Sequence, residues 1–340
     1  AAGQGGKAAA KPDLSGLKPV PFSRWMLAAP EFTREFLGGK SNNLNLLRGK
    51  LPEWMHLPVA VALPFGCCEA ALEHPLNENL RKEMKIVLAK AEQEPMRYLP
   101  TARELMLKLY PPPELREEFT AVYEKSGLPP VHWDHAWRAI KRVWASKWNE
   151  RAFLSRRALG MPHAALQMAV LVQQVVNAAY AYVIHTVNPV SGDADEVFAE
   201  VVLGLGETLV GNFPGSALGF VVNKKSGAVR YASFPGKSVG LYGKGVIFRS
   251  DSNGEDLSGY AGAGLYDSVL AEPEEERVLD YAHERLLTDA AFREEMARKI
   301  AEIAVAVENV CGGPQDIEGA VQADGAYYVV QNRPQVGVGC

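Results

Sequence analysis

A hairpin pattern near the C-terminal end constrains the fold of this 340-residue chain more than any other feature. The runs DIEGAVQ and AYYVVQNRP alternate apolar and polar residues and are separated by Ala-Asp-Gly. An Asp-Gly pair between alternating runs predicts a two-residue turn at Asp324 and Gly325. That turn places Glu318 opposite Gln331 and Asp316 opposite Arg333.

These four side chains should share one face of the hairpin, because side chains along a strand alternate between faces. Carboxylate oxygens suit Mg²⁺, and a guanidinium fork suits phosphate oxygens. The set Asp316, Glu318, Gln331 and Arg333 therefore predicts a divalent-metal and phosphate site. A solvated outer face with cross-strand Asp–Arg and Glu–Gln pairs remains the alternative at this point.

Two further segments carry cations into loops. The segment FRSDSNGEDLSGYAGAGLYDSV delivers Arg249 into a loop rich in Ser, Asn and Gly, which offers backbone N–H groups to phosphates. Glu255 and Asp256 in that loop are candidates to hold a metal or to orient the arginine, and an ordinary turn is the alternative. Gly38-Gly39-Lys40 precedes a helical pattern and would bring an ammonium to a phosphate. It lacks the complete P-loop pattern, so it is not a Walker site.

The spacing of apolar residues and the positions of proline and glycine predict the other helices and strands. Prolines Pro95, Pro100 and Pro111–Pro113 are expected to break the helices. The expected helices are Glu78–Ala91, Ala102–Leu109, Glu114–Tyr123, Glu196–Leu203 and Asp289–Val310. The expected strands are AVLVQQVV, YAYVIHT, FVVN and VIFRS.

Four tryptophans, at 133, 137, 144 and 148, fall on one face of a predicted helix. Such a stripe is more typical of a buried core than of an exposed platform that stacks on sugars. We therefore expect Trp137, Trp144 and Trp148 to be packing residues.

The net charge, the longest apolar stretch and the cysteines limit the classes of protein to which the chain can belong. A net charge of −4 gives no strong case for a nucleic-acid or anionic-membrane surface. The longest apolar stretch, 164–187, contains four side-chain amides and does not predict a transmembrane helix. Four cysteines without a C-x-x-C pair indicate a reducing compartment, with Cys67 and Cys68 as buried thiols or, alternatively, a redox pair. His132 and His135 have no partners that complete a zinc pattern.

Three regions follow from these patterns. Residues 1–18, rich in Ala, Gly and Lys, are expected to form a flexible linker. Residues 19–165 form a largely helical N-terminal lobe with the lysine loop, and residues 166–340 form a second lobe with the phosphate loop and closing hairpin. The missing initiating methionine suggests a piece of a longer protein.

Several motifs together resemble a known family. GGKSNNLNLL, RSDSNGEDLSGYAGAGLYDSV and PQDIEGAV with YYVVQNRP resemble the ATP-binding domain of phosphoenolpyruvate synthase, pyruvate phosphate dikinase and the glucan water dikinases. The order in which WASKWNERA, VIHTVNPVSGD and GLGETLVG precede the arginine segment is similar to α-glucan water dikinases over residues 20–336. The resemblance is closer to the starch-granule form than to the phosphoglucan form.

This resemblance implies an α+β fold of the ATP-grasp type, with two lobes around an ATP cleft. It implies that Lys40 and Arg249 bind the ATP phosphates and that Asp316 and Glu318 hold Mg²⁺ or position ATP. Gln331 joins them, and Arg333, with Arg249, acts catalytically by stabilising charge on the phosphoryl group in transfer.

The resemblance also implies a reaction. The β-phosphate of ATP passes to a histidine and then to a glucosyl hydroxyl of starch, while the γ-phosphate goes to water. The family's relay histidine lies on an upstream domain in an S-H-x-S context that none of the seven histidines here has. The expected partners are thus ATP, that phosphohistidine domain and, through other domains, α-glucan in the plastid stroma or at the starch granule, with no nucleic acid and no membrane.

Two alternatives remain open. The first is the ATP-binding module of a pyruvate-type dikinase, against which the order of the motifs argues. The second is a non-catalytic starch-associated scaffold, against which the complete set of Lys40, Arg249, Glu318, Gln331 and Arg333 argues.

Overall fold

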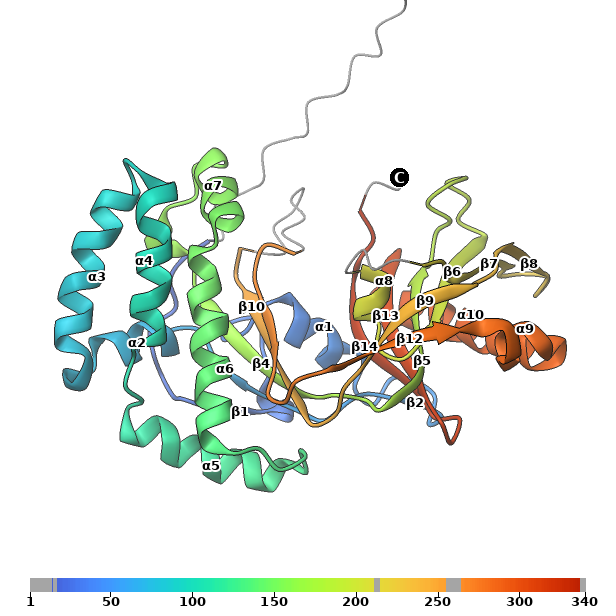
Figure 1. The fold of residues 1–340 in the computed structure, drawn as a ribbon, viewed down its shortest axis with the longest axis horizontal. Coiled ribbons are helices and arrows are strands. Elements are labelled where there is room, and N and C mark those ends of the chain that lie inside the picture. Colours follow the sequence, from blue (N-terminus) through green and yellow to red (C-terminus); the bar gives the residue numbers. More distant parts are fainter. Residues whose placement is uncertain (1–13, 15–16, 211–214, 255–263, 337–340) are drawn as a thin grey trace, which may run out of the picture.

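The structure, a computed structural model, describes residue 14 and residues 17–210, 215–254 and 264–336. The expected linker, residues 1–18, lies almost entirely outside this part. In Figure 1 a group of helices, α2 to α7, lies on one side and a large sheet with α10 on the other, and β4 and β10 run between them. The fold is mixed helix and sheet, in agreement with the expected α+β class.

One sheet has five strands in the order β1-β3-β4-β10-β11, all antiparallel. Its members are β1 (Leu27–Ala28), β3 (Ala60–Leu63), β4 (Met168–Gln174), β10 (Val246–Ser252) and β11 (Ser268–Leu270). The strands β4 and β10 are almost wholly buried, which agrees with the apolar first five residues of β4, whereas β10 also buries the polar residues Ser250, Asp251 and Ser252.

The larger sheet has seven strands in the order β2-β14-β13-β5-β6-β7-β8, and β2 is its single parallel member. Its strands are β2 (Met55–His56), β14 (Tyr327–Pro334), β13 (Gln315–Gln322), β5 (Ala178–His185), β6 (Glu196–Leu203), β7 (Leu218–Asn223) and β8 (Val229–Ser233). A separate ribbon pairs β9 (Lys237–Tyr242) with β12 (Glu275–Asp280).

The helices follow the predicted pattern with two corrections. They are α1 (Gly39–Leu47), α2 (Cys67–Glu73), α3 (Glu78–Ala91), α4 (Pro95–Leu107), α5 (Pro113–Ser126), α6 (Trp133–Ala145), α7 (Glu150–Ala158), α8 (Glu207–Val210), α9 (Arg285–Thr288) and α10 (Ala290–Cys311). Pro100 was expected to break the chain but lies inside α4, which begins at Pro95. The carbonyl that loses its hydrogen-bond partner belongs to Met96, an exposed residue in the first turn of the helix.

The segment Glu196–Leu203 was predicted to be helical and is the strand β6 instead. Its apolar residues Val197, Ala199 and Val201 are buried at every second position, which is the period of a strand. Both edges of β6 are paired, with β5 and β7. Tertiary pairing, which the local sequence does not reveal, decides this element.

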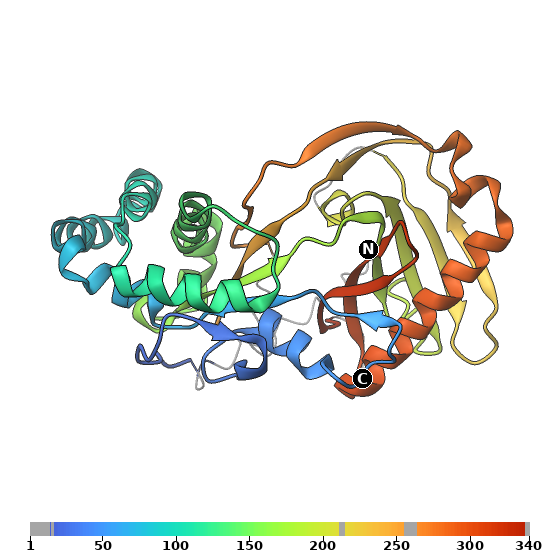
Figure 2. The same cartoon turned by 90° about the horizontal axis from the view of Figure 1, so that it is seen from below.

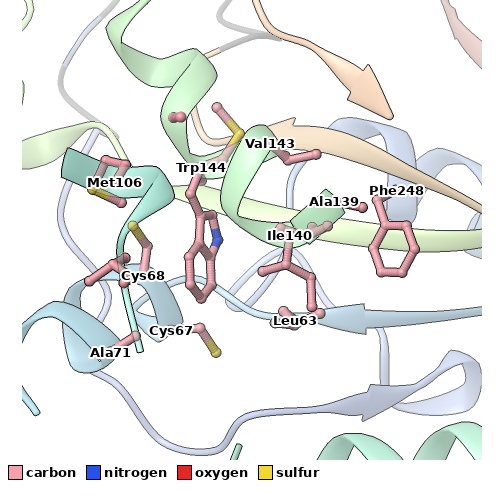
Figure 3. Close-up of a cluster of buried hydrophobic side chains, with 14 of the residues drawn as sticks. Leu63, Cys67, Cys68, Ala71, Met106, Ala139, Ile140, Val143, Trp144 and Phe248 are labelled. Atoms are coloured by element: carbon pink, nitrogen blue, oxygen red, sulfur yellow. The ribbon is translucent and has the colours of Figure 1, made fainter. Parts of the chain in front are cut away.

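The tryptophan stripe is part of the core, as predicted. Trp137, Trp144 and Trp148 are buried, and Trp144 is fully inaccessible. Figure 3 shows Trp144 among the side chains of Cys67, Cys68 and other core residues. Burial raises the pKa of both thiols, with a further contribution from the charge of Glu69, so both stay protonated.

A second core lies between the seven-stranded sheet and α10, which runs along that sheet in Figure 2. Asp289 caps this helix by accepting a hydrogen bond from the Phe292 N–H at 3.0 Å, and Gly312 ends it in the left-handed conformation. Residues Met296, Ile300 and Ala304 face the sheet and are buried. One face of the sheet is thus apolar and covered by α10.

The chain passes between the two sheets more than once. The strands β4, β10 and β11, all C-terminal to residue 166, share one sheet with β1 and β3, whereas β2 from the N-terminal part pairs with β14. The predicted domain boundary at 165/166 therefore does not separate the sheets. No helix in the described part of the chain combines the length and apolar character that a bilayer span requires.

We predict that Trp144→Ala lowers the free energy of unfolding by about 3–5 kcal/mol, because it opens a large cavity in the first core. Urea unfolding would measure this loss. Trp133→Ala on the same helix is the control, since Trp133 is only partly buried and should cost less than half as much. Equal losses for the two variants would contradict the assignment of Trp144 to the core.

Candidate functional site

The closing hairpin has the predicted pairing at its polar end. Glu318 lies opposite Gln331, and Asp316 lies opposite Arg333. The predicted two-residue turn is wrong, however, because the Gln322 N–H donates to the Ala326 carbonyl at 2.9 Å and leaves a three-residue loop. The left-handed φ of 89° at Gly325 is typical of such loops.

A β-bulge reconciles the longer loop with the predicted pairs. The register shifts between Glu318 and Gly319, so Val330 on β14 is an extra residue. The Val330 carbonyl accepts hydrogen bonds from Gln173 Nε2 at 2.9 Å and from Arg249 Nη1 at 3.4 Å. Both donors belong to the five-stranded sheet, so the bulge residue joins the two sheets.

Gly319 is required at the bulge for steric reasons. A Cβ at this position would lie 2.1 Å from the Tyr182 ring. The Tyr182 hydroxyl donates to the Tyr328 carbonyl at 2.8 Å, and the ring is fully buried. A larger residue would displace that ring from beneath the site.

The face of the seven-stranded sheet opposite α10 carries the polar side chains at one end, while α8 and β9 pack against apolar residues elsewhere on it. Residues opposite one another on β14, β13, β5 and β6 share this face, because paired residues point the same way. They enclose a cavity of about 200 Å³. Its walls are Val183, His185, Glu200, Leu209, Asp316, Ile317, Glu318, Gln331 and Arg333.

Arg249 reaches this group from β10 of the other sheet. Its Nη2 donates to Gln331 Oε1 and lies 3.8 Å from Glu318 Oε2, while Nη1 donates to Gln173 Oε1 at 3.3 Å. Gln331 Nε2 in turn donates to Glu318 Oε1 at 3.1 Å. The Arg249 side chain is only 14% exposed, so most of its interactions are with protein.

Asp316 forms the second polar group of the cavity. Its Oδ2 accepts from Arg333 Nε at 3.3 Å, and its Oδ1 lies 2.7 Å from His185 Nδ1. Both carboxylate oxygens are thus occupied by cationic or polar donors. The His185 ring also lies against Phe198, with centroids 6.1 Å apart.

Lys40 lies in the first turn of α1, outside the cavity wall. The backbone N–H groups of Lys40 and Ser41 donate to the two oxygens of Asp251 at 2.9 and 3.4 Å. A Cβ on Gly38 would lie 2.5 Å from Asp251 Oδ1, so glycine is needed there. At the other side of α1, Asn43 donates to the Asn332 carbonyl of β14 at 3.1 Å. The lysine loop is therefore held between β10 and β14.

Five of the six predicted site residues thus meet, and Lys40 is held beside them. Glu255, Asp256 and most of the Gly-rich loop lie outside the described residues. In the described ranges no three His, Cys, Asp or Glu side chains form a metal-binding group.

Three residues of this neighbourhood were missed by sequence reasoning: Gln173, His185 and Asp251. His185 was a lone histidine in a strand, and its position opposite Asp316 follows only once β5 is known to pair with β13. Asp251 stands two residues after Arg249, and with β10 identified as a strand this spacing would have placed both on one face.

Known proteins were compared with the chain. Residues 128–231 match the family model described as the pyruvate phosphate dikinase, AMP/ATP-binding domain. The α-glucan water dikinase, chloroplastic, of Solanum tuberosum is 48% identical over 320 residues, which cover 92% of this chain and 22% of that protein. The α-glucan water dikinase 1, chloroplastic, of Arabidopsis thaliana is 45% identical over 335 residues, 96% of this chain and 24% of that protein. A phosphoenolpyruvate synthase of Pyrococcus furiosus is 27% identical over 222 residues, 65% of this chain and 24% of that protein.

The predicted resemblance is confirmed, because the chain is homologous to a segment of α-glucan water dikinases. The chain spans less than a quarter of the length of these two relatives. The expected plastid location agrees with their names, both of which carry the word chloroplastic.

We predict that Asp251→Asn lowers the free energy of unfolding by about 1–3 kcal/mol, because a buried backbone N–H of α1 loses its acceptor. Thermal or urea unfolding would measure the loss. Asp324→Asn is the control. The exposed Asp324 accepts one hydrogen bond, from the Ala326 N–H at 3.1 Å, and an amide oxygen replaces it there. The assignment fails if Asp251→Asn is as stable as the control.

Proposed function

We propose that this homologue of α-glucan water dikinases is the ATP-binding module of such an enzyme. In the proposed reaction the β-phosphoryl group of ATP passes to a histidine on another domain, and from the resulting phosphohistidine to α-glucan in the plastid, while the γ-phosphoryl group passes to water, so that AMP and orthophosphate are released. The observation that carries this proposal is the contact of Arg249 with Gln331 and Glu318. This contact brings together two of the segments that carry the resemblance. One is the arginine segment on β10 of the five-stranded sheet, and the other is the closing hairpin of the seven-stranded sheet.

The roles of the residues follow from their chemistry. Arg249 and Arg333 supply guanidinium groups to the phosphates, and Arg333 is the more exposed of the two. Lys40 adds an ammonium from the first turn of α1. Gln331 fixes Arg249 and Glu318 relative to each other. Phosphoryl transfer depends mainly on such positioning and charge stabilisation.

Mg²⁺ fits the donors present. Asp316 and Glu318 are two carboxylates on one face, and Mg²⁺ is usually bound by one or two carboxylates together with substrate phosphates. A site of this kind needs no third protein carboxylate, which agrees with the lack of a three-residue metal group among the described residues. When bound, Mg²⁺ would neutralise charge on the phosphate oxygens.

The ATP-grasp architecture is also part of the proposal. The helices α2 to α7 with the five-stranded sheet would form one lobe, and the seven-stranded sheet with α10 the other. ATP would lie against the polar sheet face, between the two. We infer a linker at residues 1–18 and two lobes at 19–165 and 166–340. Because β4, β10 and β11 belong with the first lobe, the boundary between the lobes would follow the two sheets and not a single position in the sequence.

The two alternatives are weaker. A pyruvate-type dikinase module is disfavoured, because identity to the phosphoenolpyruvate synthase is 27% against 45–48% for the glucan water dikinases. A non-catalytic scaffold would have no need to keep two arginines and two carboxylates in one network.

We predict that the chain binds Mg–ATP but does not phosphorylate glucan by itself, because it lacks the relay histidine. Isothermal titration calorimetry would measure binding, and transfer of label from β-labelled ATP to starch would measure the reaction. Absence of ATP binding would disprove the proposed function, and label in starch with this chain as sole enzyme would disprove the need for a relay.

We predict that Arg333→Lys leaves ATP binding nearly unchanged but slows turnover by about two to three orders of magnitude. Lysine keeps the charge and loses the planar fork, and removing one positioned group costs roughly 3–4 kcal/mol in the transition state. The assay uses the longer protein that includes the phosphohistidine domain. Arg277→Lys is the control, since Arg277 pairs with Glu275 on the surface.

If Arg333 were only the surface partner of Asp316, its replacement would cost within about 1 kcal/mol of stability. Full glucan phosphorylation by the Arg333→Lys protein would therefore show that Arg333 does not act on phosphate.

A further inference from the structure

His185 lies at the end of β5 on the polar face of the seven-stranded sheet, where it lines the cavity beside Asp316 and Arg333. Its side chain is 27% exposed, so it is neither a core residue nor a freely solvated one.

The hydrogen bond to Asp316 fixes the tautomer of His185. An ionised carboxylate only accepts hydrogen bonds, and Arg333 Nε donates to the other oxygen of the same carboxylate. Nδ1 of His185, at 2.7 Å from Oδ1, must therefore carry the hydrogen. In the neutral ring Nε2 is then an acceptor with a free lone pair.

The orientation of the ring is also fixed. Phe198 lies across the ring at an interplanar angle of 29°, and Asp316 holds one edge. No residue in the described part of the chain forms a hydrogen bond with Nε2. The cavity that His185 lines is also lined by Glu318 and Gln331. The lone pair is thus available to a ligand in that cavity.

The chemistry of a hydrogen-bond acceptor selects the ligand. Ionised phosphate oxygens are acceptors themselves and do not bond to a lone pair, and Mg²⁺ prefers oxygen ligands. ATP carries its own donors only at the ribose and the adenine, whereas His185 lines the cavity with Asp316, Glu318 and Arg333, the groups proposed for the phosphate end, where water is the donor. We propose that His185, oriented by Asp316, holds the water molecule that attacks the γ-phosphorus of ATP, or of the pyrophosphoryl group derived from it.

The step is balanced as follows. The water oxygen forms a bond to the γ-phosphorus, and the bond from that phosphorus to the β–γ bridging oxygen breaks. The electron pair of the broken bond stays on the β-phosphoryl oxygen. Both water hydrogens leave on the orthophosphate product. His185 thus orients the nucleophile, as water-positioning residues do in other phosphoryl transfers.

This inference rests on the proposed function, and two variants of one residue test it. The side-chain nitrogen of His185→Asn stands where Nδ1 was, so it keeps the bond to Asp316 and loses the contact with water. The amide oxygen of His185→Gln reaches the position of Nε2, so it keeps an acceptor in the cavity and loses the bond to Asp316.

Release of orthophosphate from γ-labelled ATP is measured in the longer protein that includes the phosphohistidine domain. We expect His185→Asn to slow this release about 100-fold, the usual cost of losing one positioned group, and His185→Gln to slow it less than about 10-fold. The reverse order, or equal rates in the two variants, would overturn the proposal. In the reverse case His185 would act only by anchoring Asp316.

His135→Asn is the matched control, since His135 Nδ1 lies 3.0 Å from Glu272 Oε1 at the surface and lines no part of this cavity. Its release rate should equal that of the unmodified protein. Calorimetry on each variant should give the same affinity for Mg–ATP, because His185 is not a phosphate ligand.

Nitrogen-15 NMR of the histidine rings gives a readout independent of activity. It should show hydrogen on Nδ1 of His185, and hydrogen on Nε2 would overturn the inference. A failure of the unmodified protein to bind ATP would instead remove the proposed function, so the two failures are distinguishable.

Discussion

The site depends on one partly buried arginine that joins two sheets. Arg249 projects from β10 of the five-stranded sheet and meets Gln331 and Glu318 on the seven-stranded sheet. A charged group this far from water is costly unless it is paired and hydrogen-bonded. Arg249 meets that condition through contacts with both sheets, including the Val330 carbonyl and Gln173. The relative placement of the sheets and the ionisation of the site are therefore coupled.

The sequence predicted which residues pair in the site, but not how the hairpin that carries them is built. Alternation along the hairpin correctly placed Asp316, Glu318, Gln331 and Arg333 on one face. The two-residue turn used for that argument was wrong, and the pairs survive because the bulge at Val330 compensates for the longer loop. The hairpin pattern contains no local signal for a bulge, whose stabilising partners Gln173 and Arg249 are distant in sequence.

Some helices and strands were likewise predicted by their local sequence, and others depend on pairing with distant segments. Long periodic segments such as α3, α10 and the buried strands β4 and β10 were predicted, because their own patterns determine them. The strand β6 was predicted as a helix, since its pairing partners β5 and β7 lie outside the local window. The contact between His185 and Asp316 was not predicted for the same reason, because an antiparallel pairing between distant strands brings the two residues together.

The pairing of charges in the cavity bears on how the proposed metal and nucleotide would bind. Arg249 and Arg333 contact Glu318 and Asp316, the two carboxylates proposed as ligands of Mg²⁺. A metal ion alone would compete with two guanidinium groups, and ATP alone would compete with two carboxylates. If both bound as proposed, the carboxylates could turn to the metal and the arginines to the phosphates, and each charge would exchange one partner for another. Joint binding would then leave no charge of these partly exposed pairs without a partner. The bond between Asp316 and His185 uses the carboxylate oxygen that Arg333 does not use, so this exchange would not require the histidine to move.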